Sequence, residues 1–140
     1  MNMNVFKVDI STPQKSWTFE NVVSCSAPGK KGNFQVLFNH APLISQLETG
    51  EIKIQIAEKT TYFATGGGFL EVNRNNVTLV LESCEEASEI DVERARKAAE
   101  RARKRLSSRS EGIDIARAEA ALARALNRLR VAMKIGLSSE

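Results

Sequence analysis

Apolar side chains recur at every second position in several short runs within residues 1–86. The clearest runs are Val8 and Ile10, then Ile52, Ile54 and Ile56, then Val77, Leu79 and Leu81. Successive side chains of a strand point to opposite faces, so a period of two predicts strands with one buried face each.

Residues that favour turns separate these runs at short intervals. They are PGKKGN at 28–33, TG at 49–50, EK at 58–59, GGG at 66–68 and NRNN at 73–76. Many short strands joined by tight turns predict an antiparallel β-sandwich or barrel, not a parallel sheet with crossover helices. The alternation stops after Glu82, and residues 83–91 lead into a different pattern.

Residues 87–140 follow a helical period and contain an internal repeat. The segment IDVERARKAAERARKRL begins at Ile90, IDIARAEAALARALNRL begins at Ile113, and nine aligned positions are identical. Asp91 and Asp114 stand where a helix N-cap accepts hydrogen bonds from the first free amides. We therefore expect helices over about residues 91–106 and 114–134. The short polar link at 107–112, with Gly112 at its end, favours an antiparallel hairpin.

The faces that would join the two helices are rich in alanine. They carry Val92, Ala95, Ala99, Ala102 and Leu106 in the first helix, and Ile115, Ala118, Leu122, Ala125, Leu129 and Ala132 in the second. A buried alanine removes little apolar area from water, so the pairing should be weak. Alanine also has the highest helix propensity, so each helix tolerates separation from its partner. The pattern predicts stable helices in a hairpin that can open.

Composition and charge divide at the same boundary. All three prolines and six of the eight glycines lie within residues 1–86. That segment holds 7 Lys+Arg and 9 Asp+Glu, whereas residues 87–140 hold 13 and 8, so a slightly acidic part precedes a basic one. The sequence therefore predicts an α+β protein, with an antiparallel β-sandwich at 1–86 and a two-helix hairpin at 87–140.

Each expected helix carries a stripe of arginines along the flank of its alanine face. The stripes are Arg94, Arg101 and Arg105 in the first helix, and Arg117, Arg124 and Arg128 in the second. A solvated face is the usual explanation for such charges. The repeated spacing and the scarcity of carboxylates on the second helix favour an acidic partner or a polyanionic ligand for some of them.

Signs of catalytic chemistry are absent from the sequence. The glycines at 66–68 are not followed by the GK[ST] of a phosphate-binding loop, so we expect a turn or a close backbone approach there. His40 has no neighbouring ligand set or nucleophile, which favours a turn or cap role. Cys25 and Cys84 have no metal-ligand spacing, and together with the lack of a signal segment this predicts a reduced, cytosol-facing protein. These features argue against an enzyme acting alone.

Several blocks of residues resemble the epsilon subunit of the F-type ATP synthase, called delta in mitochondria. The blocks are GNFQVL at 32–37, HAPL at 40–43, Gly50, GGFLEV at 67–72, NVT at 76–78 and RLRVA at 128–132, and the resemblance covers nearly the whole chain. One departure is Phe38-Asn39, where many members carry Pro-Gly. We expect a locally different turn there.

The resemblance implies a flattened sandwich of about ten strands followed by the hairpin, in a non-catalytic subunit. It implies that the sandwich binds the gamma subunit and the c-ring through His40, Ala41, Pro42 and Leu43, coupling a proton- or sodium-driven rotor to the catalytic head. The helices would extend to inhibit ATP hydrolysis, with the six arginines of the stripes facing acidic groups of beta in the alpha/beta head. The protein would lie peripherally on the cytoplasmic face of a bacterial plasma membrane.

The resemblance also implies a regulatory ATP site, because some members bind ATP on the folded hairpin through an I/L-D-x-x-R-A motif. Ile113–Ala118 fits that motif. The corresponding site residues are Glu85, Asp91, Arg94, Arg101, Asp114, Arg117, Arg124 and Arg128. ATP would be sensed and not hydrolysed, and no cofactor would be required. In the alternative interpretation these residues serve only as caps and as contacts to the head.

Two other functions are compatible with a basic hairpin. The first is a stand-alone ATP-binding sensor, which would show tight ATP binding and no assembly with gamma. The second is a nucleic-acid-binding module, which would bind phosphates in a salt-sensitive way. Residues 87–140 contain 8 acidic side chains among the basic ones and no aromatic residue for base stacking, which argues against nucleic acid.

Overall fold

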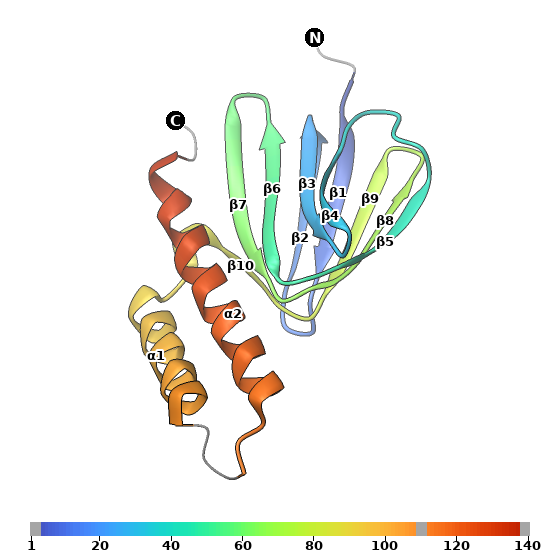
Figure 1. The fold of residues 1–140 in the computed structure, drawn as a ribbon. Helices are drawn as coiled ribbons and strands as arrows, with labels where there is room; N and C mark the ends of the chain where they lie inside the picture. Colours follow the sequence, from blue (N-terminus) through green and yellow to red (C-terminus); the bar gives the residue numbers. More distant parts are fainter. Residues whose placement is uncertain (1–3, 109–111, 138–140) are drawn as a thin grey trace.

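The computed structural model describes residues 4–108 and 112–137, in which ten strands precede two α-helices (Figure 1). The strands are β1 (Phe6–Ser11), β2 (Ser16–Val22), β3 (Ser24–Gly29), β4 (Gly32–Val36), β5 (Leu43–Leu47), β6 (Gly50–Ile56), β7 (Lys59–Thr65), β8 (Gly68–Asn73), β9 (Asn76–Leu81) and β10 (Cys84–Glu86). The helices are α1 (Val92–Ser108) and α2 (Ile115–Ala132). The predicted α+β fold, a sandwich followed by a helical pair, is confirmed.

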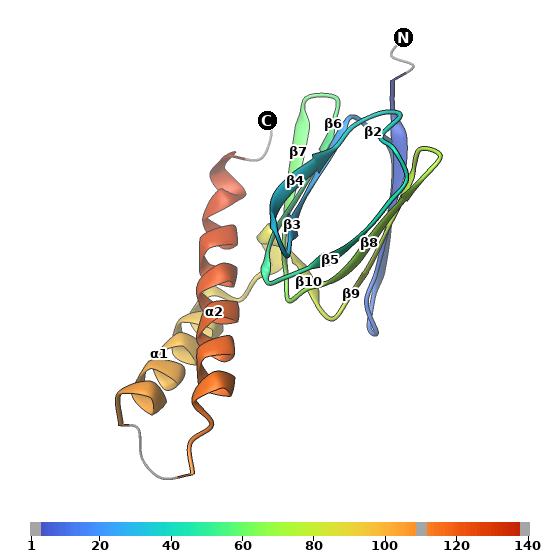
Figure 2. The same cartoon turned by 45° about the vertical axis from the view of Figure 1, so that its right-hand side comes forward.

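The strands form one sheet that folds back on itself. Its order is β10-β7-β6-β3-β5-β8-β9-β1-β2, and β4 pairs with β3. Figure 2 shows the two layers, with β3, β4, β6 and β7 facing β5, β8 and β9 across an elongated interior. The pairing is antiparallel, as predicted, except that β1 pairs in parallel with β9.

The alternating apolar positions of the sequence fill this interior. Val8, Ile52 and Leu79 are fully buried there, and their strand neighbours Phe6, Ile10, Ile54, Val77 and Leu81 are buried with them. Phe63 lies at the centre, with the rings of Trp17 and Phe19 edge-on to it at centroid distances of 5.6 and 5.9 Å. All buried members of this core lie between Phe6 and Leu81, so the sandwich has its own hydrophobic core.

The glycines at 66–68 make the close backbone approach expected from the sequence. Gly68 has a φ of +150°, and a Cβ atom there would collide with the carbonyl oxygen of Val80 on β9. Only glycine fits where β8 begins so close to its neighbouring strand. This loop leads the chain from β7, which faces the helices, to β8 in the opposite layer.

The turn at Phe38-Asn39 uses asparagine where glycine would be usual. The amide of His40 donates to the carbonyl of Leu37 at 3.1 Å, and Asn39 has a φ of +63°. A positive φ at the third turn residue is the requirement of a type II turn, which Pro-Gly also satisfies. Asn39 is further held by Asn75, whose Oδ1 accepts from the Asn39 amide at 2.7 Å. Asn39 therefore adopts the positive φ that glycine would adopt in a Pro-Gly turn, and the expectation of a locally different turn stays a prediction.

The chain adds a strand where the alternating pattern has already ended. Residues Cys84–Glu86 form β10 against β7, and Ala87–Glu89 form a 3-10 turn before α1. The three residues of β10 are all half-buried, so the strand has no alternation that sequence analysis could detect. The alternating pattern therefore ends at Glu82 as read from the sequence, although one more strand follows it.

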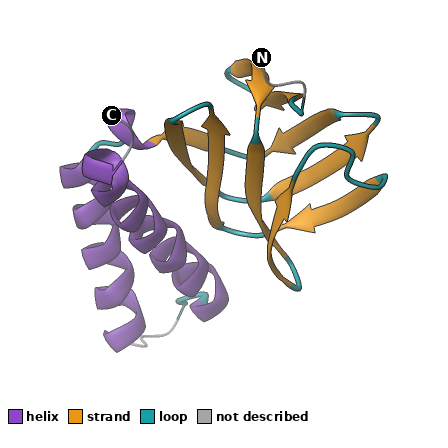
Figure 3. Ribbon diagram, turned by 90° about the horizontal axis from the view of Figure 1, so that it is seen from above, coloured by secondary structure: helices purple, strands orange, loops and turns teal. Residues whose placement is uncertain are grey.

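Both helices begin with the predicted aspartate caps. Oδ1 of Asp91 accepts from the amide of Arg94, and Oδ1 of Asp114 accepts from the amide of Arg117, each at 3.0 Å. α2 ends at Ala132, two residues earlier than expected, because the chain tightens into a 3-10 turn over Met133–Leu137. The helices run antiparallel in Figure 1 and lie along one side of the sandwich in Figure 3.

The two helices meet through alanine, as predicted. Ala95, Ala99 and Ala102 of α1 are buried, together with Ala118 and Ala125 of α2. Val92 and Ile115, the first residues of their helices, were expected on the same faces but are exposed. At roughly 0.8 kcal/mol per buried methyl-sized group, the three alanines of α1 contribute only about 2 kcal/mol.

Candidate functional site

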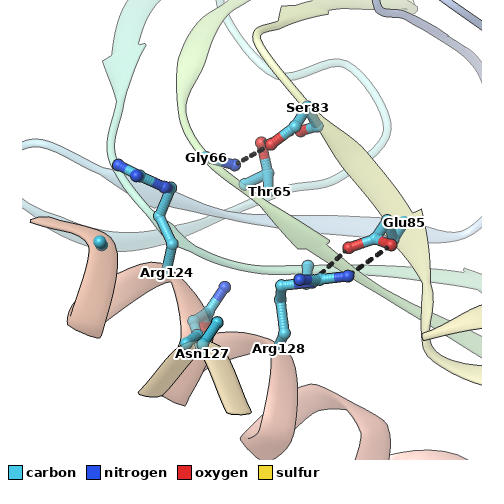
Figure 4. Close-up of a pocket in the computed structure, with 11 residues that line it drawn as sticks. Thr65, Gly66, Ser83, Glu85, Arg124, Asn127 and Arg128 are labelled. Carbon is cyan, nitrogen blue, oxygen red and sulfur yellow. Dashed lines mark hydrogen bonds and ion pairs between the residues drawn. The ribbon is translucent and has the colours of Figure 1, made fainter. Parts of the chain in front are cut away.

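A cavity of about 280 Å³ lies between the sandwich and the hairpin (Figure 4). We call it the sandwich-side cavity. It is lined by Ala64, Thr65, Gly66, Ser83, Glu85, Ala98, Ala121, Arg124, Ala125, Asn127 and Arg128. Its walls come from β7, the segment around β10 and both helices, so it exists only when the hairpin is closed and docked.

An ion pair connects the two walls of this cavity. Arg128 of α2 donates from Nε and from a terminal nitrogen to the two carboxylate oxygens of Glu85 on β10, at 2.6 and 3.0 Å. Both side chains are only partly exposed. A bidentate arginine-carboxylate pair is among the stronger polar contacts, and partial solvent screening reduces its net contribution to about 1 kcal/mol.

The sandwich side of the cavity has a backbone already fixed by short hydrogen bonds. The hydroxyl of Ser83 accepts from the amide of Gly66 at 3.1 Å, and the hydroxyl of Thr65 donates to the carbonyl of Ser83 at 2.8 Å. These bonds join the GGG loop to the segment before β10. The wall that faces α2 is therefore preorganised.

At the edge of the cavity, the C-terminal half of α2 is anchored to the sandwich. Asn127 is only 2% exposed, and its Nδ2 donates to the carbonyl of Gly50 at 2.8 Å. A small apolar cluster of Tyr62, Ala64, Ala87, Ile90, Val131 and Ala132 surrounds this contact. Nζ of Lys134 lies 3.2 Å from a carboxylate oxygen of Glu51 and 5.1 Å from the centre of the Tyr62 ring.

A second cavity, of about 390 Å³, lies at the loop end of the hairpin. We call it the inter-helix cavity. It is lined by Arg105, Gly112, Ile113, Asp114, Arg117, Ala118, Ala121 and Arg124. Arg124 and Ala121 line both cavities, so the two spaces adjoin along one side of α2. In Figure 4 the Arg124 side chain extends away from the pair of Glu85 and Arg128.

The structure divides the expected nucleotide residues among three places. Glu85, Arg124 and Arg128 line the sandwich-side cavity, whereas Asp114 and Arg117 line the inter-helix cavity with Arg124. Asp91, which caps α1, and Arg94 and Arg101 of α1 are exposed and line neither cavity. The repeat gives Ile90–Ala95 the same I-D-x-x-R-A pattern as Ile113–Ala118, and in both copies the aspartate caps a helix.

Residues His40–Leu43 lie away from the helices and next to an exposed apolar patch. Ile44 is 73% exposed, and Phe69 and Val80 are each 56% exposed, on the outer face of β5, β8 and β9. Pro42 and Leu43 line a shallow hollow beside Ile44. Nδ1 of His40 lies 2.7 Å from the carbonyl oxygen of Ala41, so the ring takes part in the local turn.

Sequence analysis missed the anchoring residues Asn127, Glu51 and Lys134. It assigned α2 one apolar face, the alanine face, whereas Asn127 and Val131 lie on a second face toward the sandwich. The available signal was Val131, an apolar residue that lies away from the alanine face, because apolar side chains are uncommon on the solvent-exposed face of a helix. The contacts of Asn127 with Gly50 and of Lys134 with Glu51 join residues far apart in the sequence, so no local sequence pattern predicts them.

The cysteines carry no reactive chemistry. Burial raises the pKa of the Cys25 thiol to about 12, and burial followed by the charge of Glu85 raises that of Cys84 to about 12. Both thiols therefore stay protonated near neutral pH and are poor nucleophiles. Within residues 4–108 and 112–137, no cluster of His, Cys, Asp and Glu could hold a metal ion. None of the helices described is both long and apolar enough to span a bilayer.

Comparison with known proteins places this arrangement in a family. Residues 5–87 match the family model "ATP synthase, Delta/Epsilon chain, beta-sandwich domain", and residues 88–133 match "ATP synthase, Delta/Epsilon chain, long alpha-helix domain". The chain belongs to the ATP synthase delta/epsilon family. The resemblance found in the sequence is thereby confirmed.

Curated relatives support the assignment over most of the chain. The ATP synthase epsilon chain of Nitratidesulfovibrio vulgaris is 46% identical over 124 residues, covering 89% of this chain and 92% of the relative. That of Syntrophobacter fumaroxidans is 43% identical over 128 residues, covering 91% and 96%. That of Staphylococcus aureus is 40% identical over 131 residues, covering 93% and 98%.

Solved structures share the fold of this family member. A chain of the Euglena gracilis mitochondrial ATP synthase superposes with a TM-score of 0.77 at 21% identity, covering 98% of this chain and 83% of that one. A chain of the central stalk and c-ring of the Tetrahymena thermophila mitochondrial ATP synthase gives 0.56 at 16% identity, covering 91% and 93%.

Proposed function

We propose that the protein is a central-stalk subunit that couples an ion-driven membrane ring to gamma and restrains ATP hydrolysis through its helical hairpin. One observation carries this proposal. A well-packed sandwich holds a hairpin whose helices meet through alanine and whose docking rests on one side of α2. Such an element can exist in two states that differ by a few kcal/mol, as a regulatory switch requires.

The sandwich would be the coupling part. The patch of Ile44, Phe69 and Val80 is the type of exposed apolar surface that marks a protein interface. The strands that carry it, β5, β8 and β9, lie in the layer opposite β7 and the helices (Figure 2), so we expect a partner there not to compete with α1 or α2. We assign this patch to gamma, and the adjoining His40, Ala41, Pro42 and Leu43 to contacts with gamma or the c-ring.

The hairpin would be the inhibitory part. Opening separates α1 from α2 and frees the arginines of both stripes, which carry no salt bridge within the described residues except for Arg128 with Glu85. Guanidinium groups on a persistent helix suit acidic groups on the beta subunits of the alpha/beta head. The proposal has the open form inhibit hydrolysis and the closed form permit it.

ATP would favour the closed form. The sandwich-side cavity places Arg124 and Arg128 opposite Glu85 and the hydroxyl of Ser83, between the parts that opening would separate. A ligand that binds only the closed state stabilises it by mass action. The protein would sense ATP without hydrolysing it; the one carboxylate that lines the cavity, Glu85, is already paired with Arg128.

Isothermal titration of ATP into the full chain and two variants tests this site. Arg124→Ala should abolish binding, because it removes a cation that lines both cavities. The matched control is Arg103→Ala, which removes the same charge from an exposed position of α1 that lines neither cavity. Unchanged ATP binding by Arg124→Ala, with the helical content preserved by circular dichroism, would contradict the proposed site.

A further inference from the structure

Two connections at the upper end of the sandwich are joined by a pair of asparagines. The loop over residues 37–42 links β4 to β5, and the turn at 74–75 links β8 to β9 (Figures 1 and 2). Oδ1 of Asn75 accepts from the amide of Asn39 at 2.7 Å, and Nδ2 of Asn75 donates to Oδ1 of Asn39 at 3.0 Å. The side chain of Asn75 therefore binds both the backbone and the side chain of Asn39.

Asn75 projects from a backbone that is fixed on two sides. Arg74 and Asn75 have φ values of +52° and +61°, and they connect the paired residues Asn73 and Asn76 as the two central residues of a tight hairpin turn. The carbonyl of Asn75 also accepts from the amide of Lys7, next to β1, at 3.1 Å. The turn is thus held by β1, β8 and β9 together, and it offers a rigid support for the side chain.

The loop that Asn75 holds has a demanding backbone. Asn39 has a φ of +63°, whereas Phe38 has no positive φ, so residues 37–40 form a type II turn. The turn contributes one bond of its own, from the amide of His40 to the carbonyl of Leu37 at 3.1 Å. Ala41 and Pro42, which follow directly, are exposed. A short exposed loop of this kind retains conformational freedom unless other elements restrain it.

We propose that Asn75 is a positioning residue for the contact of His40–Leu43 with gamma or the c-ring, which we call the rotor contact. Its side chain fixes the loop in the shape that the partner meets, so less conformational entropy is lost on association. Neither asparagine belongs to the hydrophobic core, so loss of the pair should lower affinity and leave the sandwich folded. This inference rests on the proposed rotor contact, and the experiment below tests the two separately.

The restraint on the loop is measured first in the free full chain. Asn75→Gly removes the side-chain amide, and glycine keeps the positive φ that the β8–β9 turn requires. Hydrogen exchange of the Asn39 amide should speed up about fivefold or more, with the core strands unchanged. The matched control is Asn76→Ala, because Nδ2 of Asn76 bonds within its own turn, 3.5 Å from the carbonyl of Arg74. It should leave the exchange of Asn39 unaltered.

The effect on association is measured as the Kd of each full-length variant for ATP synthase depleted of its epsilon chain. Asn75→Gly should raise this Kd about fivefold or more, and Asn76→Ala should change it less than twofold. Phe38→Pro in the Asn75→Gly background should restore the Kd, because proline restricts φ at the second residue of a type II turn. Phe38→Pro alone should bind as the unaltered chain does, and circular dichroism verifies the fold of each variant.

Replacement of an exposed residue of the loop separates the inference from the proposed function. Pro42→Glu places a charge directly in the rotor contact and should weaken binding. Weaker binding by Pro42→Glu but not by Asn75→Gly would overturn the positioning role and leave the rotor contact standing. If neither variant weakens binding, the loop does not contact the rotor and both proposals fail. A raised Kd for Asn75→Gly without faster exchange at Asn39, or without rescue by Phe38→Pro, would also overturn the positioning role.

Discussion

At the residue scale, Asn127 makes a buried polar contact between α2 and the sandwich. It is buried against β6 and gives its amide to the carbonyl of Gly50, while its Oδ1 lies 3.4 Å from a guanidinium nitrogen of Arg130. When a buried polar group is left without its hydrogen-bond partner, the folded state is destabilised by the full desolvation free energy of that group. The docking of α2 on the sandwich should therefore be sensitive to Asn127, although this residue belongs to neither of the arginine stripes singled out in the sequence.

Replacing this side chain should loosen α2 without unfolding the sandwich. Asn127→Ala leaves the Gly50 carbonyl without its partner and should weaken docking by about 1–3 kcal/mol. Amide hydrogen exchange should then speed up in α2 and stay unchanged in the strands of the core. The control Asn33→Ala removes an exposed amide from β4 and should alter neither. Equal protection of α2 in both variants would show that the hydrogen bond contributes nothing.

The cysteines predict a loss of stability in alkali. The pKa values of Cys25 and Cys84 are raised from 9.0 to about 12, so folding favours the protonated thiols. This contribution is fully present below pH 9 and is lost as the pH rises toward 12. The urea midpoint should fall more steeply between pH 9 and 11 for the native chain than for Cys25→Ala/Cys84→Ala. Parallel pH profiles would mean that burial does not perturb these thiols.

At the element scale, the strands and helices follow from local patterns more completely than the site does. Alternation at Val8, Ile52 and Leu79 predicted strands because one face had to be buried, and Asp91 and Asp114 predicted helix starts because free amides need acceptors. β10 escaped prediction because it is paired but only half-buried. The sequence also did not predict that the arginines divide between two cavities, because that division depends on how α2 packs against β7.

The alanine contact between α1 and α2 leads to a test of the switch. Ala99→Leu adds three heavy atoms at a position that is 1% exposed, and overpacking there should weaken the closed hairpin by about 1–3 kcal/mol. Leucine keeps a high helix propensity, so each helix should persist. Spin labels on Lys104→Cys and Glu119→Cys should report a larger open population. Ala123→Leu, at an exposed position of α2, is the control and should leave the distance distribution unchanged.

At the scale of the whole molecule, two hydrophobic clusters of unequal size stabilise different parts: one holds the sandwich together and the other docks the hairpin on it. The larger lies within the strands between Phe6 and Leu81, and the smaller joins Tyr62 and Ala64 of β7 to Val131 and Ala132 of α2. Loss of the smaller cluster would release the hairpin and leave the sandwich folded. Residues 1–86 contain the whole larger cluster, so they should fold alone and keep the patch of Ile44, Phe69 and Val80.

The unequal clusters also explain how one chain could hold two roles. A rigid sandwich transmits torque only if it stays folded while its partners turn, whereas an inhibitor must change shape at low energetic cost. The two requirements are met in different parts of the chain. The strands share a continuous hydrophobic core, whereas the helices meet through alanine and are held to the sandwich by few polar contacts. The proposed coupling and inhibition would thus reside in different parts of the chain.

The central claim, that the hairpin is an inhibitory switch on a coupling sandwich, is tested most directly by ATP hydrolysis. An ATP synthase head depleted of its epsilon chain would be assayed after addition of the full chain, of residues 1–86, or of Ala99→Leu. The account predicts that residues 1–86 bind without inhibiting, that the full chain inhibits, and that Ala99→Leu inhibits more strongly because it favours the open form. Equal inhibition by the full chain and residues 1–86, or weaker inhibition by Ala99→Leu, would contradict it.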